Sequence, residues 1–233
     1  VDSPTNNFCT LNPLANNLAT TLSQGNLKSV PTTHNDFVVW STFGFTSGKW
    51  YVEVHDTNQG DAAGGIVGIS STHHGGHLSS GDDNSHIRMG NGLHTTTGTD
   101  NGDTTAGVTG DIFTIAVNAD IGSVWYAKNA APDVSTTAQA TGLDLTPPRD
   151  YRFGQQESNS GDTSMTFNFG QDSSFAGLKV AQGNQDSNDI GDFYYTPPTD
   201  YLALCTSNLP EPAVTPSEHF DVALYVGNGS TQN

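Results

Sequence analysis

The sequence predicts an all-β protein, an antiparallel two-sheet β-sandwich with long polar loops. Short runs of alternating or continuous apolar residues recur along the chain, each bounded by Gly, Asn, Asp or Pro, and this is the pattern of strands and turns. No helical stripe extends beyond one or two turns. The composition agrees, because the 233 residues include 26 Gly and 11 Pro but also 11 Phe, 7 Tyr and 3 Trp, too many aromatic residues for a disordered chain.

The expected strands follow from this alternation. The clearest of them places Trp50, Val52 and Val54 on one face. Tyr51 and Glu53 fall on the other face. Further along, two β-branched runs flank a turn rich in Asn, Asp and Gly and predict a hairpin. The expected strands are 37–40 and 41–45, paired with each other, and then 50–54, 65–69, 112–117, 124–127, 151–153, 165–169 and 201–205.

Two connections are long and polar, residues 70–108 and 172–192. Loops of this length are uncommon unless they are functional, so we expect any binding surface there, with the sandwich as scaffold. The best helical candidate, residues 130–140, is interrupted by Pro132 and rich in β-branched residues, so we expect no helix in it.

The charge balance excludes several partners. Lys and Arg number 7 against 24 Asp and Glu, a formal charge of −17, which argues against nucleic acid and against an anionic membrane surface. No apolar run approaches the roughly 18–20 residues that span a bilayer. We expect one domain at 1–212 and a linker with the start of a following segment or domain at 213–233, and we interpret the sequence as an excerpt of a longer one.

Five histidines fall close together between residues 73 and 94. Neutral imidazole binds zinc, copper or nickel, but the spacing lacks a His-Glu-x-x-His helix or a thiolate pair. Two interpretations therefore stay open: a solvated polar loop, which the spacing favours, and a metal site whose metal is unknown. The candidate residues of this loop are His73, His74, His77, Asp82, Asp83, Asn84, His86 and His94.

A second polar loop alternates acidic and amide residues: Asn184, Asp186, Asn188 and Asp189. Calcium takes six to eight oxygen ligands, but Asp189 occupies the position at which an EF-hand has Gly, and no Glu closes the loop. Asn and Asp also form turns through their own backbone bonds. We expect no cofactor, and calcium held weakly at millimolar concentrations is the alternative that stays open.

The patterns of common catalytic sites are missing. Glu53 is alone on its strand, so no strand carries the in-phase pair of acids that a glycoside hydrolase requires. There is no Gly-x-Ser-x-Gly elbow and no phosphate loop containing Gly-Lys-Ser or Gly-Lys-Thr. We therefore predict that the protein is not an enzyme.

Cys9 and Cys205 lie near the two ends of the predicted domain, both in strand-like segments. If the first and last strands pair, a disulfide between these cysteines would close nearly the whole domain and stabilise it by about 4–5 kcal/mol. We predict this disulfide, with two buried free thiols as the alternative, since free cysteine is among the most buried residue types.

Four segments carry a family pattern: residues 48–54, 65–69, 110–118 and 124–129. They resemble the SPRY (B30.2-like) pattern, in which a Gly-Lys-x-Tyr-x-Glu-Val strand precedes a Val-Gly-Ile strand, a Gly-Asp-x-Ile strand and a strand running into Lys-Asn-Gly. The chain has Asn118 where Asp is frequent and Ala130 where that last Gly stands. The resemblance extends over residues 8–209 and implies a concanavalin-like sandwich that binds partners through loops at one end.

Five further segments show a narrower similarity: residues 3–8, 11–14, 21–27, 167–171 and 197–210. They resemble SPRY-like modules in virion structural proteins of marine bacteriophages. In those proteins a segment similar to residues 220–230 opens another domain. The resemblance implies adhesion or assembly and provides no catalytic residues to transfer.

Our first functional hypothesis is a structural and adhesive module of a phage or phage-like particle, in a tail fibre, tail tip or capsid-surface appendage, and so a virion or extracellular location. Its partners would be other virion subunits or copies of itself, and a cell-surface glycan, without nucleic acid or membrane insertion. The alternative is a stand-alone glycan-binding lectin with Trp40, Trp125 and Tyr126 as its aromatic platform. A third hypothesis is a filament assembled by strand donation from residues 1–8 or from the tail after Pro212.

Overall fold

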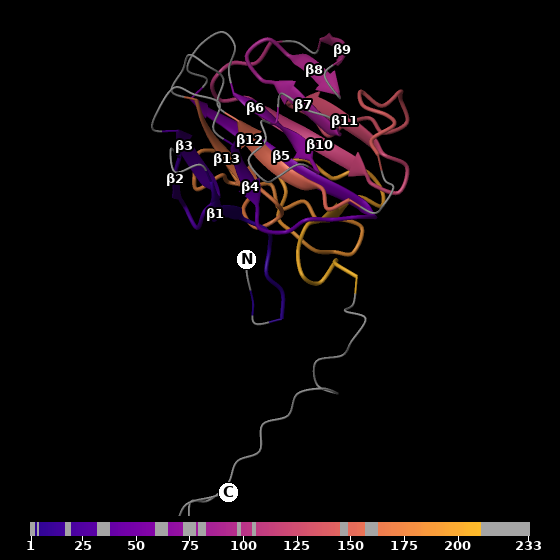
Figure 1. The fold of residues 1–233 in the computed structure, drawn as a ribbon. Helices are drawn as coiled ribbons and strands as arrows, with labels where there is room; N and C mark the ends of the chain where they lie inside the picture. The colour runs from indigo at the N-terminus through magenta and orange to yellow at the C-terminus, as the bar shows by residue number, and fades with distance from the viewer. Residues whose placement is uncertain are drawn as a thin grey trace, which may run out of the picture.

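Two β-sheets pack face to face in this protein (Figure 1). The structure, a computed structural model, describes residues 3, 5–16, 20–31, 38–58, 65–71, 78, 83–96, 99–103, 106–144, 149–156 and 163–210. These residues contain strands and no helix. The strands are β1 (Leu11–Asn16), β2 (Thr20–Ser23), β3 (Lys28–Pro31), β4 (Val38–Ser41), β5 (Lys49–Asn58), β6 (Ile66–Ser70), β7 (Asn84–Arg88), β8 (Leu93–Thr96), β9 (Thr99–Asp103), β10 (Ile112–Asn118), β11 (Ser123–Lys128), β12 (Arg152–Gln156), β13 (Ser164–Asn168) and β14 (Leu202–Ala203).

The strand order defines the two layers. The first sheet runs β1-β4-β12-β6-β7-β8-β9, and the second runs β11-β10-β5-β13-β3-β2. Neighbours in both orders are antiparallel. The two-residue β14 pairs with β5 in parallel. This architecture confirms the predicted fold class.

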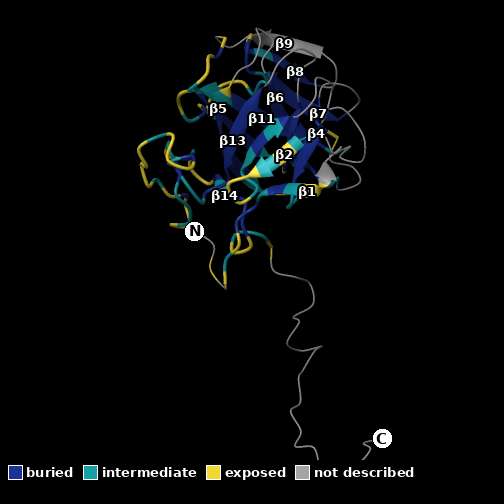
Figure 2. Cartoon of the chain, turned by 90° about the vertical axis from the view of Figure 1, so that its left-hand side faces the viewer, coloured by how far each residue is buried: buried dark blue, intermediate teal, exposed yellow. Residues whose placement is uncertain are grey.

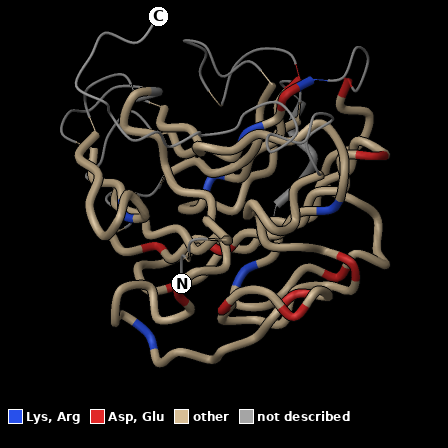
Figure 3. The backbone as a smooth tube through the Cα atoms, turned by 90° about the horizontal axis from the view of Figure 1, so that it is seen from below, with Lys and Arg blue, Asp and Glu red and all other residues tan. Residues whose placement is uncertain are grey.

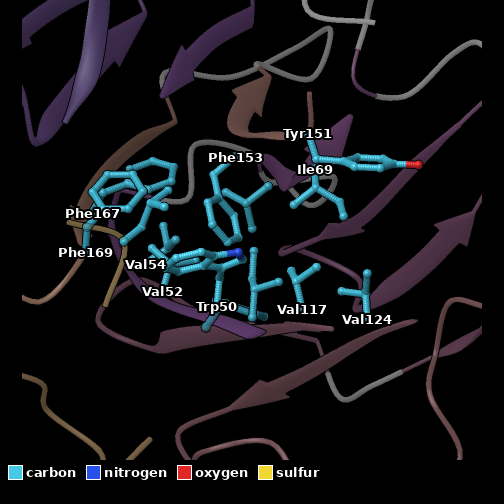
Figure 4. Close-up of a cluster of buried hydrophobic side chains, with 14 of the residues drawn as sticks. Trp50, Val52, Val54, Ile69, Val117, Val124, Tyr151, Phe153, Phe167 and Phe169 are labelled. Atoms are coloured by element: carbon cyan, nitrogen blue, oxygen red, sulfur yellow. The ribbon is translucent and has the colours of Figure 1, made fainter. Parts of the chain in front are cut away.

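The core lies between the two sheets. As the alternation predicts, β5 supplies Trp50, Val52 and Val54 to it, and all three are buried. They meet Phe153 of β12, from the first sheet, and Phe167 of β13, their neighbour in the second (Figure 4). Each large apolar side chain buried in this way contributes about 1.5–3 kcal/mol relative to exposure, so the interlayer core is the main source of stability.

The outer face of the second sheet is buried as well. Residues 170–205, here called the cover segment, fold over it, and Phe193 packs against Tyr51 of β5 with ring centroids 5.1 Å apart. Glu53, expected on a face opposite the core, is fully buried under the same segment. Figure 2 shows the central strands in the dark blue of buried residues. The central strand β5 therefore has no solvent-exposed face over most of its length.

Several predicted strands are confirmed. They correspond to β5, β6, β10, β11, β12 and β13, including the hairpin of β10 and β11, and the predicted strand at 201–205 is shortened to β14. The expected pairing of 37–40 with 41–45 is wrong. Residues 38–41 form β4, which pairs with β1 and β12, and residues 43–45 form no strand. Strands β1, β2 and β3 have no counterpart among the predicted ones.

The prediction of one long loop at 70–108 is also wrong, because β7, β8 and β9 lie within it. Their polar sequences give no hydrophobic alternation. The neighbouring strand β6 explains the position of β7 instead. A side chain at Gly68 of β6 would collide with the backbone of Ser85 and with His86, so the glycine allows β7 to approach closely. The second predicted loop, 172–192, contains no strand.

The first and last described segments pair with each other. Phe8 and Cys205 form an antiparallel bridge, and the Cys9 backbone N–H donates to the carbonyl of Leu204 (2.9 Å). The first and last segments of the described sandwich therefore lie next to each other at this point. The predicted linker at 213–233 lies outside the described residues. Among the residues described, no helix is long and apolar enough to cross a membrane.

Candidate functional site

The predicted histidine cluster does not come together in the described part of the chain. His86 of β7 and His94 of β8 are both buried. Because His86 stands opposite Thr95 in the register, the preceding residue His94 points to the other face of the sheet, so these two imidazoles cannot bind the same metal. Asn84 is buried at the start of β7. Four residues of the cluster lie outside the described residues: His73, His74, His77 and Asp82.

Asp83 ties together connections at one end of the sandwich. Its Oδ1 accepts hydrogen bonds from the backbone N–H of Asp144 (2.7 Å) and from the hydroxyl of Tyr151. Its Oδ2 accepts from the hydroxyl of Ser71, and Arg149 Nε lies 3.5 Å away. Asp83 is only 3% exposed. The structure thus gives this predicted binding residue an internal, structural role.

Asp186 has a similar role in the second predicted loop. Its Oδ1 accepts from the backbone N–H groups of Asn188 (2.8 Å) and Ile190 (3.0 Å). Its Oδ2 accepts from the backbone N–H of Ala203 and from Asn208 Nδ2, both at 2.8 Å. Four donors occupy this carboxylate, so it is not free to bind calcium.

The neighbouring loop residues also bond within the loop. The backbone groups of Asn184 and Phe193 bond to each other, and Asn184 Oδ1 accepts from the hydroxyl of Thr196 (3.0 Å). Asp189 takes a left-handed conformation (φ 57°) that closes the turn after Asp186. No group of three His, Cys, Asp or Glu side chains within the described ranges is placed to hold a metal ion.

The predicted disulfide is wrong in this structure, where Cys9 and Cys205 are buried free thiols. The segments do pair as expected, but the register places Cys205 opposite Phe8 and not opposite Cys9. Since adjacent residues of a strand point to opposite faces, the Cys9 thiol enters the core between the sheets and the Cys205 thiol enters the cluster under the cover segment.

We expect two reactive thiols per chain when the protein is unfolded in denaturant without reductant, and none while it is folded. Burial raises the pKa of both thiols, Cys9 and Cys205, and so disfavours the reactive thiolate in the native state. Titration with a thiol reagent measures both numbers. A denatured chain without reactive thiols, and a mass about 2 Da lower from the loss of two hydrogens, would show a bridge.

Glu53 is the most densely bonded carboxylate that the sequence did not identify as a site residue. Its Oε1 accepts from the Tyr195 backbone N–H (2.8 Å) and the Tyr51 hydroxyl (3.1 Å). Its Oε2 accepts from the Tyr194 backbone N–H (2.8 Å) and Asn168 Nδ2 (3.0 Å). Glu53 thereby fixes the cover segment to the second sheet. The one sequence feature that could have identified Glu53 is that it is a single acid within an apolar strand.

Burial dominates the electrostatics of Glu53. It raises the pKa of this carboxyl to about 7, and the four hydrogen-bond donors oppose that rise. A buried acid with a pKa near neutrality titrates in the range where proteins function. Its contacts are all internal, however, so the described geometry supports a role in holding the fold.

Asp56, three residues along the same strand, is buried without any hydrogen-bond partner at either carboxylate oxygen. Burial, and then the charge of Asp111, raise the pKa of Asp56 to about 6. Asp111 itself is well supported, by Asn129 Nδ2 (2.8 Å), by the Val108 backbone N–H (3.0 Å) and by Lys128 Nζ at 3.6 Å. The ionised carboxylate of Asp56 therefore destabilises the folded protein.

The aromatic platform of the lectin hypothesis is not available. Trp40, Trp125 and Tyr126 are exposed by only 3%, 7% and 4%.

A pocket of about 130 Å³ lies at the surface, but its aromatic residues, Phe45 and Trp50, are also buried. Acidic positions are spread over several connections of the fold (Figure 3). The residues lining the pocket are Gly44, Phe45, Thr46, Ser47, Trp50, Asp150, Leu209 and Pro210.

Comparison with solved structures decides the fold. The SPRY domain of human HERC1 superimposes with a TM-score of 0.55 at 13% identity, over 67% of this chain and 96% of that domain. The chain has a SPRY-like fold. The TRIM65 PSpry domain is also similar, with a TM-score of 0.49 and 14% identity over 69% of this chain and 92% of that one. No family model and no curated protein matches the sequence.

The SPRY-like fold agrees with the pattern found in the four sequence segments. At 13% identity the likeness to HERC1 concerns the fold, and it transfers no binding residue to this chain. The candidate site must therefore be built from this chain alone. Its distinguishing feature is a set of irregular connections that Glu53, Asp83 and Asp186 hold in fixed shapes.

Proposed function

We propose that this chain is a non-catalytic interaction module of a structural protein in a phage or phage-like particle. It would stand on the virion surface, in a tail fibre, a tail tip or a capsid appendage. Its partners would be other virion subunits or copies of itself, and a cell-surface glycan. The SPRY-like fold supports the interaction role, and the resemblance of residues 3–8 and 197–210 to bacteriophage modules supports the virion location.

The observation that carries the proposal is the way the long connections are held. The cover segment contains almost no regular secondary structure, yet two backbone N–H groups donate to Glu53, and Asp186 accepts four hydrogen bonds. A surface fixed in one shape loses little conformational entropy when it binds. Irregular connections on a rigid sandwich also tolerate sequence change without disturbing the core. Both properties suit a surface that contacts other subunits or a host.

Two observations test the location. Antibodies raised against the chain should label purified particles at discrete positions in immunogold electron microscopy, whereas pre-immune serum should not. The genes that flank the coding sequence should include capsid, portal or tail genes. An operon of metabolic genes, with unlabelled particles, would contradict the proposal.

A further inference from the structure

Two acidic residues stand opposite each other at one end of the interlayer core. On β5, Asp56 continues the inward-facing row to which Val54 belongs. Asp111, just before β10, stands opposite Asp56, whose backbone N–H donates to the Asp111 carbonyl (2.9 Å). The regular pairing of β5 with β10 begins at the next position, His55 with Ile112. Side chains that face each other in an antiparallel pair have Cβ atoms about 4.5–5.5 Å apart, so the two carboxylates are neighbours.

Protein groups already balance the charge of Asp111. Its Oδ1 accepts from Asn129 Nδ2 and its Oδ2 from the Val108 backbone N–H, while Lys128 Nζ lies 3.6 Å from Oδ2. Lys128 belongs to β11, which pairs with β10 on the side away from β5, and it also donates to the carbonyl of Ala106 (2.6 Å). A carboxylate has about four acceptor sites, so Asp111 Oδ1, with one donor, can take a further ligand.

Asp56 has no such support. It is 0% exposed, and both of its carboxylate oxygens are buried without a hydrogen-bond partner. Within the described part of the chain no cationic side chain forms an ion pair with it. Burial and the charge of Asp111 raise its pKa only to about 6, so the carboxyl is mostly ionised at pH 7. Buried charges in proteins are paired or coordinate a metal ion, and Asp56 has no charge partner from the protein.

The available ligands are oxygen atoms, and they suit calcium. Calcium takes six to eight oxygens, accepts a carboxylate through both of its oxygens and completes its shell with carbonyls and water. Asp56 offers two oxygens and Asp111 offers one. Zinc and copper favour imidazole or thiolate. The adjacent imidazole, His55, lies on the other face of β5, where it packs against Phe175 with ring centroids 5.4 Å apart.

We propose that Asp56 and Asp111 bind one calcium ion at this end of the core, with Asp56 contributing both carboxylate oxygens. The ion supplies the counter-charge that Asp56 does not receive from the protein, so calcium stabilises the folded state. Because only two carboxylates take part, the dissociation constant falls at about 10⁻⁴–10⁻³ M, the range of extracellular calcium modules. The inference goes beyond the proposed function and does not depend on it.

Equilibrium dialysis and thermal unfolding of the full chain at pH 7, after treatment with EDTA, test this site. Dialysis against calcium chloride should show one ion bound per chain. Calcium at ten times its dissociation constant should raise the melting temperature by about 3–6 °C. Potassium chloride at the same ionic strength should not reproduce this rise. An equal rise with potassium would show that salt only screens the formal charge of −17, and it would contradict the inference.

Asp56→Asn should abolish both the binding and the rise in melting temperature. This variant should fold, because losing the buried charge stabilises the metal-free chain. Asp189→Asn is the matched control: Asp189 is exposed in the second predicted loop, and its left-handed backbone (φ 57°) suits Asn equally. The control should bind calcium as the unmodified chain does.

Three results would each overturn the inference: an unmodified chain that binds no calcium, normal binding by Asp56→Asn, or binding lost in Asp189→Asn. The last would place the ion in the loop. A chain that binds no calcium but still labels particles would leave the proposed function standing.

Discussion

Replacing Glu53 with alanine is expected to lower the free energy of unfolding by about 3–5 kcal/mol at pH 5. The substitution leaves the Tyr194 and Tyr195 backbone N–H groups without their acceptor, at a cost of about 1–3 kcal/mol each, and opens a cavity beneath the cover segment. Denaturant unfolding measures the loss. Amide hydrogen exchange should accelerate more at Tyr194 and Tyr195 than in the strands of the interlayer core, whereas a defect elsewhere in the core would not single out these two amides.

Two control variants separate the parts of this site. Tyr51→Phe removes one donor to Glu53 and should cost only about 1 kcal/mol. Glu53→Gln keeps a carbonyl acceptor but cannot ionise. The ordinary pKa of the carboxyl is 4.5 and the folded protein raises it to about 7, so stability present below pH 4.5 is lost as the pH rises to 7, by about 3 kcal/mol. The Gln variant should lose this pH dependence, and an unchanged pH profile would contradict the assignment.

Replacing Asp56 with asparagine is expected to stabilise the protein at pH 7 by about 3 kcal/mol. The folded protein raises the pKa of this carboxyl from 3.8 to about 6. Its contribution to stability is therefore complete below pH 3.8 and is lost as the pH rises to 6. Thermal unfolding at pH 4 and pH 7 checks the effect, which should be near zero at the lower pH.

Replacing Asp111 with asparagine is expected to change the stability at pH 7 in the opposite direction from Asp56→Asn. Burial disfavours the charge on Asp111, but Asn129, Val108 and Lys128 together lower its pKa, so its ionised form stabilises the fold and the variant should be less stable at pH 7. If both variants were destabilised equally at pH 7, the interpretation of Asp56 as an unsupported buried carboxylate would be wrong.

Hydrophobic alternation predicted the strands whose faces differ in polarity. The inner face of β5 and the hairpin of β10 and β11 follow directly from it. It could not predict β7, where Asn84 and His86 are buried within the sheet, because their burial depends on the neighbouring Gly68 and on the rest of the sheet. Strand pairing is a long-range property, which explains why β4 was assigned the wrong partner.

The candidate site was harder to predict than the fold. Asp83 and Asp186 were identified as polar loop residues, which is correct, but the sequence does not show that backbone N–H groups fill their lone pairs. The sequence predicts that the terminal segments pair but not in which register, and a shift of one residue decides whether Cys9 and Cys205 share a face.

The pairing of Phe8 with Cys205 determines how the module would respond to mechanical load. In an antiparallel bridge the chain before Phe8 and the chain after Cys205 leave from the same end of the ladder, only about 5 Å apart. Tension applied between these two exits would break the hydrogen bonds one after another, as in a zipper, beginning with those outermost. The sandwich interior would carry none of that force until the zipper had opened.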